Sequence, residues 1–190
     1  GLGLLLAAPT IADHGSQEQI DTFVRDIVTG EDAWCQLFSE PGAGSDLAGL
    51  TCRAIEDGDG WIVTGQKVWT SLGQTADLGM LIARTAPDLP KHQGITYFGI
   101  DMHQPGVEIR PLRQITGASH FSEVFLTGAR VPNDAVLAEE DIAGSLAHAE
   151  MLSSIGVLTA DELTQVQRGL GAIRDEVRAF AESISDLPED

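Results

Sequence analysis

Two short segments carry the residue types that could do chemistry. The first, residues 38–46, reads Phe-Ser-Glu-Pro-Gly-Ala-Gly-Ser-Asp. Gly42 and Gly44 permit backbone conformations that are closed to other residues, so that successive N–H groups can face one concavity and hold an anion such as a pyrophosphate. Ser45 adds a hydroxyl donor. The same composition is also typical of a simple turn, and it matches neither the Walker nor the Rossmann pattern.

The second segment, residues 65–71, reads Gly-Gln-Lys-Val-Trp-Thr-Ser. An indole such as that of Trp69 can stack on a flat heterocycle, and the hydroxyls of Thr70 and Ser71 can bond to the edge of that ring. A core tryptophan at the end of a strand is the alternative.

Three regions that differ in predicted secondary structure must hold these two segments in place. Residues 1–33 are predicted to be helical, with a capping box at Ser16 and Gln19 and a glycine stop at Gly30. Residues 34–136 hold many short strand-like runs separated by turn residues, which favours a small antiparallel barrel or sandwich. Residues 137–190 are predicted to form a helical hairpin, giving an α+β fold with three parts. The strands are expected at 51–56, 61–64, 78–85, 95–102, 107–112 and 121–126, with the first two joined by Asp57-Gly58-Asp59-Gly60.

The two segments together resemble the acyl-CoA dehydrogenase family. The resemblance rests on residues 38–46 and 60–71, and it is extended by 124–126 and 131–132. It implies that residues 1–33 end an N-terminal helical domain and that 34–136 form the middle β-barrel domain. The family uses FAD to oxidise the Cα–Cβ bond of an acyl-CoA thioester.

The resemblance also implies roles for single residues. Phe38 and Ser39 would lie against the flavin, with Ser39 bonding to the isoalloxazine edge, and Trp69 would stack near it. Thr70 and Ser71 would bond on the N5 side, where hydride is accepted and donors stabilise the charge of reduction. Ser45 would lie where FAD meets the acyl-CoA substrate. The expected cofactor-binding residues are Phe38, Ser39, Gly44, Ser45, Trp69, Thr70 and Ser71.

The catalytic base of the family is a carboxylate from a C-terminal helical bundle, and we expect nothing after Pro132 to match that bundle. Residues 137–190 resemble instead the N-terminus of argininosuccinate lyase, and the matching stretches are 137–149, 156–163, 169–170 and 188–190. We therefore expect an incomplete or composite chain that changes family near residues 136–138. Its function is interpreted as FAD-dependent acyl-CoA oxidation; the alternatives are a non-catalytic folded fragment and a lyase-type chain.

The net charge and the cysteine content indicate which binding partners and which compartment to expect. The formal net charge is −18, which disfavours binding to nucleic acid and to anionic membranes. Cys35 and Cys52 do not make a disulfide framework and are interpreted as reduced thiols of a cytoplasmic protein. The five histidines show no metal-binding spacing. The expected partners are an acyl-CoA substrate, an acceptor of the electron-transfer flavoprotein type and further copies of the chain, because the apolar face of residues 142–177 needs covering.

Overall fold

The computed structural model describes residues 1–137, 159 and 161–169. The chain divides into two compact units, Gly1–Ala138 and Glu139–Asp190. The first unit holds both segments singled out above. Each unit is described by itself.

Two helical rods begin the first unit, and each mixes α-helical with wider π-helical turns. The first runs through η1 (Gly3–Ala7) and α1 (Ala8–His14), and the second through α2 (Gln17–Gln19), η2 (Ile20–Val24) and α3 (Arg25–Thr29). The predicted capping box is confirmed, because the Ser16 hydroxyl accepts from the Gln19 N–H and the Gln19 side chain accepts from the Ser16 N–H. The predicted stop is also confirmed, since Gly30 adopts a left-handed φ of 78°.

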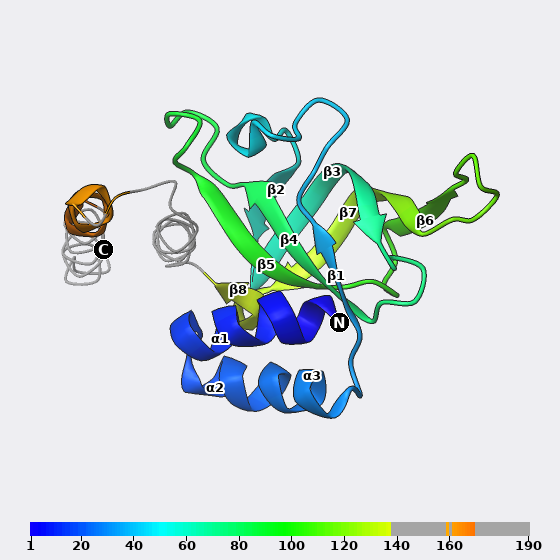
Figure 1. Cartoon of the computed structure of the whole chain (residues 1–190), viewed down its shortest axis with the longest axis horizontal. Helices are drawn as coiled ribbons and strands as arrows, with labels where there is room; N and C mark the ends of the chain where they lie inside the picture. Colours follow the sequence, from blue (N-terminus) through cyan, green and yellow to red (C-terminus); the bar gives the residue numbers. More distant parts are fainter. Residues whose placement is uncertain (138–158, 160, 170–190) are drawn as a thin grey trace. The chain divides into compact units, whose positions relative to one another are not determined.

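The remainder of the unit is a curved mixed sheet. The strands along it run in the order β6-β7-β3-β2-β4-β5-β8, and β1 pairs with β4 beside this path. Their bounds are β1 (Trp34–Leu37), β2 (Arg53–Asp57), β3 (Gly60–Ser71), β4 (Leu78–Arg84), β5 (Ile95–Asp101), β6 (Val107–Leu112), β7 (Phe121–Pro132) and β8 (Val136–Leu137). In Figure 1 the sheet is strongly curved, and the helices α1, α2 and α3 lie together along one end of it.

The predicted fold class is confirmed, with two differences in pairing. The turn after Asp57 joins β2 to β3 as expected, with Asp57 opposite Gly60 and Gly58 at a φ of 65°. However, β1 pairs with β4 in parallel, and β2 meets β4 in parallel at Arg53 and Arg84. These contacts join strands that are far apart in sequence, so no turn signal indicates them.

The packing forms a main core inside the curved sheet and a second core under the helices. Phe98, Leu81 and Val124 are fully buried in the main core. In the second core, Trp34 of β1 packs with Ile11, and the edge of its ring meets the ring of Phe23 at 5.7 Å between centroids. The helices therefore cover β1 and β4, and β1 leads directly into the first chemical segment.

Gln19 connects the helices to the far end of this unit. Its side-chain amide donates to the carbonyls of Asp134 (2.9 Å) and Val136 (3.0 Å), in addition to its bond with the Ser16 N–H. One side chain thus provides hydrogen-bond partners for a backbone N–H at the start of α2 and for two backbone carbonyls at β8 and just before it.

Replacing Gln19 by methionine is expected to destabilise the unit by about 1–2 kcal/mol, because three backbone groups lose their partner. The matched control is Gln17→Met, since Gln17 lies on the same helix and bonds only to exposed Asp21; its effect is expected to stay within about 0.5 kcal/mol. Urea unfolding followed by circular dichroism measures both. Equal losses in the two variants would contradict this role for Gln19.

In the second unit the structure describes a helix over residues 161–169 and the residue that caps it. A capping box begins this helix: the Thr159 hydroxyl accepts from the Glu162 N–H, and the Glu162 carboxylate accepts from the Thr159 N–H (2.9 Å). The rest of the predicted hairpin lies outside the described residues.

Candidate cofactor-binding site

The glycine-containing segment begins as a tight turn directly after β1. Glu40 and Ala43 exchange two backbone hydrogen bonds, of 2.8 and 3.1 Å, with Pro41 and Gly42 exposed between them. Neither Gly42 nor Gly44 has a positive φ, so the expectation that they use conformations closed to other residues is wrong. A Cβ atom on either would meet nothing within 4 Å. The chain alone therefore does not require glycine there, and open space lies above the backbone.

A backbone contact brings the first half of this segment against β3. The Val68 N–H donates to the Ser39 carbonyl at 2.9 Å. Ser39 therefore lies directly beside the residue that precedes Trp69, although 29 residues separate Ser39 from Val68. Gly44 and Ser45 continue past the turn and are exposed.

A buried ion pair lies beneath this contact and was assigned no role from sequence. The Lys67 ammonium donates to the Glu40 carboxylate at 2.9 Å and to the Phe38 carbonyl at 3.0 Å. The same carboxylate accepts from the N–H and hydroxyl of Thr51 and from the Cys52 N–H. The signal that could have found Lys67 is strand alternation, which puts it on the same face of β3 as the buried Val63.

The environment of this pair fixes the charge of Glu40. Burial by itself raises the pKa of its carboxyl group, but the hydrogen bond from the Thr51 N–H, the Lys67 ammonium and the Cys52 N–H more than offset it. The net effect holds the pKa of Glu40 below its ordinary value. Burial also raises the pKa of the neighbouring Cys52 thiol to about 11, so this thiol stays protonated.

Trp69 lies at a bulge in β3 and points outward. Between Lys67 and Thr70 the strand has one residue more than the facing stretch of β7, where Val124 and Ser122 are the partners. Trp69 takes up the extra length with a left-handed φ of 61°, and it is 61% exposed. The alternative of a core tryptophan is therefore wrong, and a broad aromatic surface faces solvent.

The two hydroxyl residues after Trp69 face different surroundings. Thr70 is fully buried, with its side chain among Gly73 and Ser122, and its hydroxyl has no hydrogen-bond partner in the described part of the chain. Ser71 is half-buried, two positions from Trp69 along β3. Of the two, Ser71 is the more accessible to a ligand held by Trp69.

Leu72, the residue directly after this segment, has a strained backbone conformation. Its φ is 58°, in the left-handed region that costs an ordinary side chain about 1 kcal/mol, and its side chain is 59% exposed. Replacing Leu72 by asparagine, which tolerates this region, is expected to stabilise the unit by about 0.5–1 kcal/mol. Thermal unfolding measures the gain. The control Leu89→Asn removes a leucine of similar exposure (49%) without a positive φ and is expected to give none.

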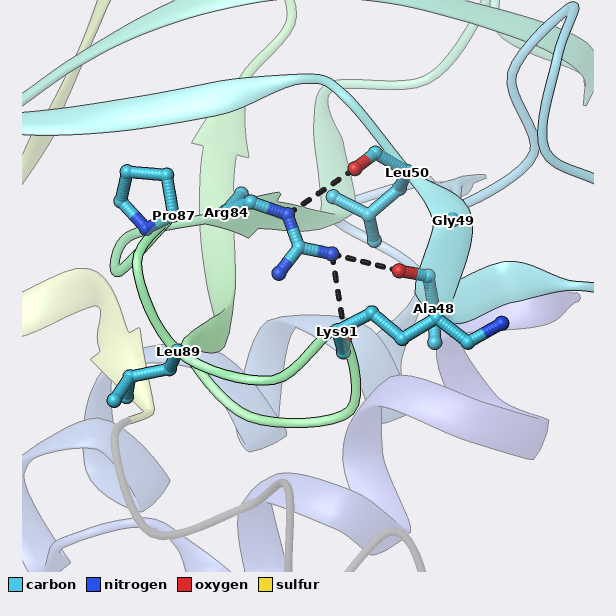
Figure 2. A pocket seen from close by; sticks show the side chains of 7 residues that line it. All are labelled: Ala48, Gly49, Leu50, Arg84, Pro87, Leu89 and Lys91. Atoms are coloured by element: carbon cyan, nitrogen blue, oxygen red, sulfur yellow. Dashed lines mark hydrogen bonds between the residues drawn. The ribbon is translucent and has the colours of Figure 1, made fainter.

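A separate hollow lies beyond the glycine-containing segment and is not lined by any of the expected site residues. Figure 2 shows the Arg84 guanidinium donating to the carbonyls of Ala48 (2.7 Å), Leu50 (3.3 Å) and Lys91 (3.2 Å). Lys91 in turn donates to both oxygens of Asp46, the last residue of the segment. Arg84 therefore fastens residues 48–50 to the β4–β5 loop, and Lys91 of that loop holds the end of the segment at Asp46. The hollow, of about 260 Å³, is lined by Ala48, Gly49, Leu50, Arg84, Pro87, Leu89 and Lys91.

The geometry fits a flat heterocycle with a polar edge. It offers the exposed ring of Trp69, and an open glycine backbone to which a ligand can come close. The hydroxyls of Ser39, Ser45 and Ser71 have no protein partner among the described residues. Nor do those residues contain a group of three or more histidine, cysteine or acidic side chains that could hold a metal ion, or a helix long and apolar enough to cross a membrane.

Comparison with known sequences agrees with this geometry. The pattern described as "Acyl-CoA dehydrogenase, middle domain" matches residues 35–129, which span β1 to most of β7. The chain belongs to the acyl-CoA dehydrogenase family.

Two curated relatives are from Mycobacterium tuberculosis. Acyl-CoA dehydrogenase FadE34 is 60% identical over 131 residues, which is 69% of this chain and 18% of that protein. Acyl-CoA dehydrogenase IpdE1 is 38% identical over 176 residues, covering 93% of this chain and 46% of that protein. The second alignment runs beyond the change of family that was expected near residues 136–138. The chain spans less than half the length of either relative.

Solved structures show the same fold. The steroid acyl-CoA dehydrogenase Tcur3481-Tcur3483 superposes with a TM-score of 0.69 at 26% identity, over 91% of this chain and 52% of that one. A glutaryl-CoA dehydrogenase from Mycobacterium smegmatis, in complex with FADH2, superposes with a TM-score of 0.61 at 25% identity, over 90% of this chain and 50% of that one.

Proposed function

We propose that the first unit supplies one wall of the FAD and acyl-CoA site of an oxidoreductase that oxidises the Cα–Cβ bond of an acyl-CoA thioester. The observation that carries this proposal is Trp69, an exposed indole held at a bulge beside the segment that contains Ser39. Bound FAD would supply the hydride acceptor. The related glutaryl-CoA dehydrogenase structure with FADH2 supports the choice of cofactor.

In this proposal each of the site residues has one task. Trp69 stacks on the isoalloxazine ring, with Phe38 against it, and Ser39 and Ser71 donate hydrogen bonds to its polar edge. The open backbone around Gly44 lets the cofactor come close, and Ser45 lies where cofactor and substrate meet. Thr70 supports this wall from beneath, because its hydroxyl is buried. The base that removes the α-proton is assigned to a part of the protein outside residues 1–137.

The test is a titration of the purified chain with FAD, followed by absorbance between about 300 and 500 nm and by flavin fluorescence. Stacking on Trp69 is expected to quench the flavin, and Trp69→Ala to weaken binding about tenfold, which corresponds to roughly 1.4 kcal/mol of lost ring contact. The control Ile115→Ala removes an apolar side chain that is fully exposed and is expected to change nothing. A wild-type chain that leaves the absorbance and fluorescence of excess FAD the same as those of free FAD would refute the proposal.

Turnover separates this function from a folded fragment without activity. Incubation with a panel of acyl-CoA thioesters and an artificial electron acceptor is expected to reduce the acceptor only when the base-bearing part of the protein is present. The physiological acceptor is proposed to be of the electron-transfer flavoprotein type. Substrate-dependent reduction by the chain on its own would show that the base lies within it.

The second unit is proposed to associate copies of the chain in the cytoplasm. Leu163 and Val166, on its described helix, are half-buried, while the residues around them are exposed. The free, buried Cys35 and Cys52 of the first unit are consistent with a reducing compartment. Removal of residues 139–190 is expected to lower the mass in light scattering and leave the sheet intact.

A lyase-type role for residues 137–190 is the alternative. It rests on the sequence resemblance and on the boundary between the two units at Ala138, close to the predicted change of family. Its test is release of fumarate from argininosuccinate. Absence of fumarate would leave the association role as the only proposal for this unit.

A further inference from the structure

The Glu40–Lys67 pair is an unusual element for a site of this kind, because both charged groups are almost completely removed from solvent. The Lys67 side chain is 0% exposed and that of Glu40 3% exposed. Removing two charges from water costs several kcal/mol each, and a well-packed apolar pair of similar volume is often equally stable. Stability alone is therefore a weak reason for an ion pair here.

The ion pair makes hydrogen bonds to two segments of backbone, which an apolar pair could not make. Lys67 donates to the carbonyl of Phe38 and to the carboxylate of Glu40, the two neighbours of Ser39 in the chain. On its other side, Glu40 holds the N–H groups of Thr51 and Cys52 at 2.7 and 2.9 Å. The ammonium thus holds the chain on both sides of Ser39, and the carboxylate anchors this arrangement to the chain entering β2.

The same lysine lies two residues before Trp69 on β3. Between them, the N–H of Val68 donates to the carbonyl of Ser39. Among the described residues, the hydrogen bonds that fix residues 38–40 to β3 therefore all involve Lys67 or its neighbour Val68. The separation between Ser39 and Trp69 depends on this short stretch.

We propose that Glu40 and Lys67 are a positioning pair, which sets the spacing between the Ser39 hydroxyl and the Trp69 ring that a flavin must fit. This inference rests on the proposed function above for the identity of the ligand. It adds that binding depends on two charged residues that cannot reach the ligand themselves. Hydrophobic residues of the same size would keep the fold and lose the spacing.

The decisive variant is the double replacement Glu40→Gln with Lys67→Met. It removes both charges together. The introduced glutamine has nearly the size of glutamate and keeps one acceptor oxygen, for one of the two N–H groups of Thr51 and Cys52 that Glu40 binds, so the chain is expected to fold. The Phe38 carbonyl loses its donor, and the chain around Ser39 is released. The single variant Lys67→Met leaves the Glu40 charge buried without its partner and is the more severe change.

Two measurements on the full chain test whether the double variant has lost this positioning. The first is hydrogen exchange of the Val68 amide without cofactor, which is expected to become about tenfold faster in the double variant while exchange across β4 and β5 is unchanged. The second is FAD affinity at a temperature where circular dichroism shows both proteins folded, which is expected to fall about tenfold. A purely structural pair would lower the unfolding temperature and leave both values as in the wild type.

The matched control removes an exposed ion pair from another strand. Arg110 and Glu108 on β6 lie 2.8 Å apart and are both more than half exposed. Glu108→Gln with Arg110→Met is expected to leave Val68 exchange and FAD affinity unchanged.

The outcomes separate the two claims. A folded Glu40→Gln/Lys67→Met variant with wild-type Val68 exchange and wild-type FAD affinity would overturn the positioning role. Faster Val68 exchange in this variant, combined with no FAD binding by the wild type, would support the mechanical role of the pair and refute the flavin function. Faster exchange together with weaker binding supports both.

Discussion

Replacing Gly65 by alanine is expected to destabilise the first unit by about 3 kcal/mol, one of the largest effects of a single methyl group in this chain. A Cβ atom at this position would lie 2.6 Å from Cβ and 2.7 Å from Cα of Cys52. Cys52 cannot move aside, because its N–H is bound by Glu40 and its carbonyl accepts from the Arg84 N–H at 2.7 Å.

The control for Gly65→Ala is Gly42→Ala, which adds the same methyl group where nothing lies within 4 Å and φ is not left-handed. Its effect is expected to stay within about 0.5 kcal/mol. Urea unfolding of both variants gives the comparison. A Gly65→Ala protein as stable as Gly42→Ala would show that β2 and β3 are further apart than described.

Acid is expected to remove the contribution of Glu40 to stability. The pKa of Glu40 is held below its ordinary value of about 4.5 in the folded chain. A carboxyl whose folded pKa is lowered contributes fully above its unfolded pKa, and the contribution is lost as pH falls through the folded pKa. Protonation then leaves the Lys67 ammonium buried without a counter-charge, so the folded chain loses stability.

The measurement is the free energy of unfolding of the wild type and Glu40→Gln from neutral pH to about pH 3. The variant is expected to be less stable at neutral pH, and the two curves to converge as the pH falls, because the wild type loses the charge that the variant never had. Contributions from exposed carboxylates such as Glu108 are common to both proteins. A constant difference between the curves would contradict the assignment.

Sequence patterns predict the parts of this fold that are decided locally. The capping box at Ser16, the stop at Gly30 and the turn after Asp57 each depend on residues within four positions of one another, and all three are confirmed. The strands β1 and β8 were not predicted. They are short, and they exist because of partners far along the chain, β4 for β1 and β5 for β8.

The candidate site was predictable in its composition and less so in its geometry. Trp69 was identified by type, but its exposure depends on a bulge, which arises from a mismatch in length with β7. The buried Lys67 was passed over because lysine is almost always at the surface. Its burial is possible only because Glu40 and the Phe38 carbonyl, from another segment, accept hydrogen bonds from its ammonium group.

The hydrogen bonds of Gln19 also set an order of events during synthesis. They join the second helical rod to Asp134 and Val136, which are 115 and 117 residues further along the chain. A ribosome must therefore translate nearly the whole first unit before the rod can complete its contacts. Contacts this distant in sequence slow folding, so the apolar face carrying Ile27 and Ile11 stays uncovered until its sheet has formed. The nascent chain therefore exposes this apolar face from the time its helices emerge until Met80 of β4 has emerged, and the hydrogen bonds of Gln19 form last.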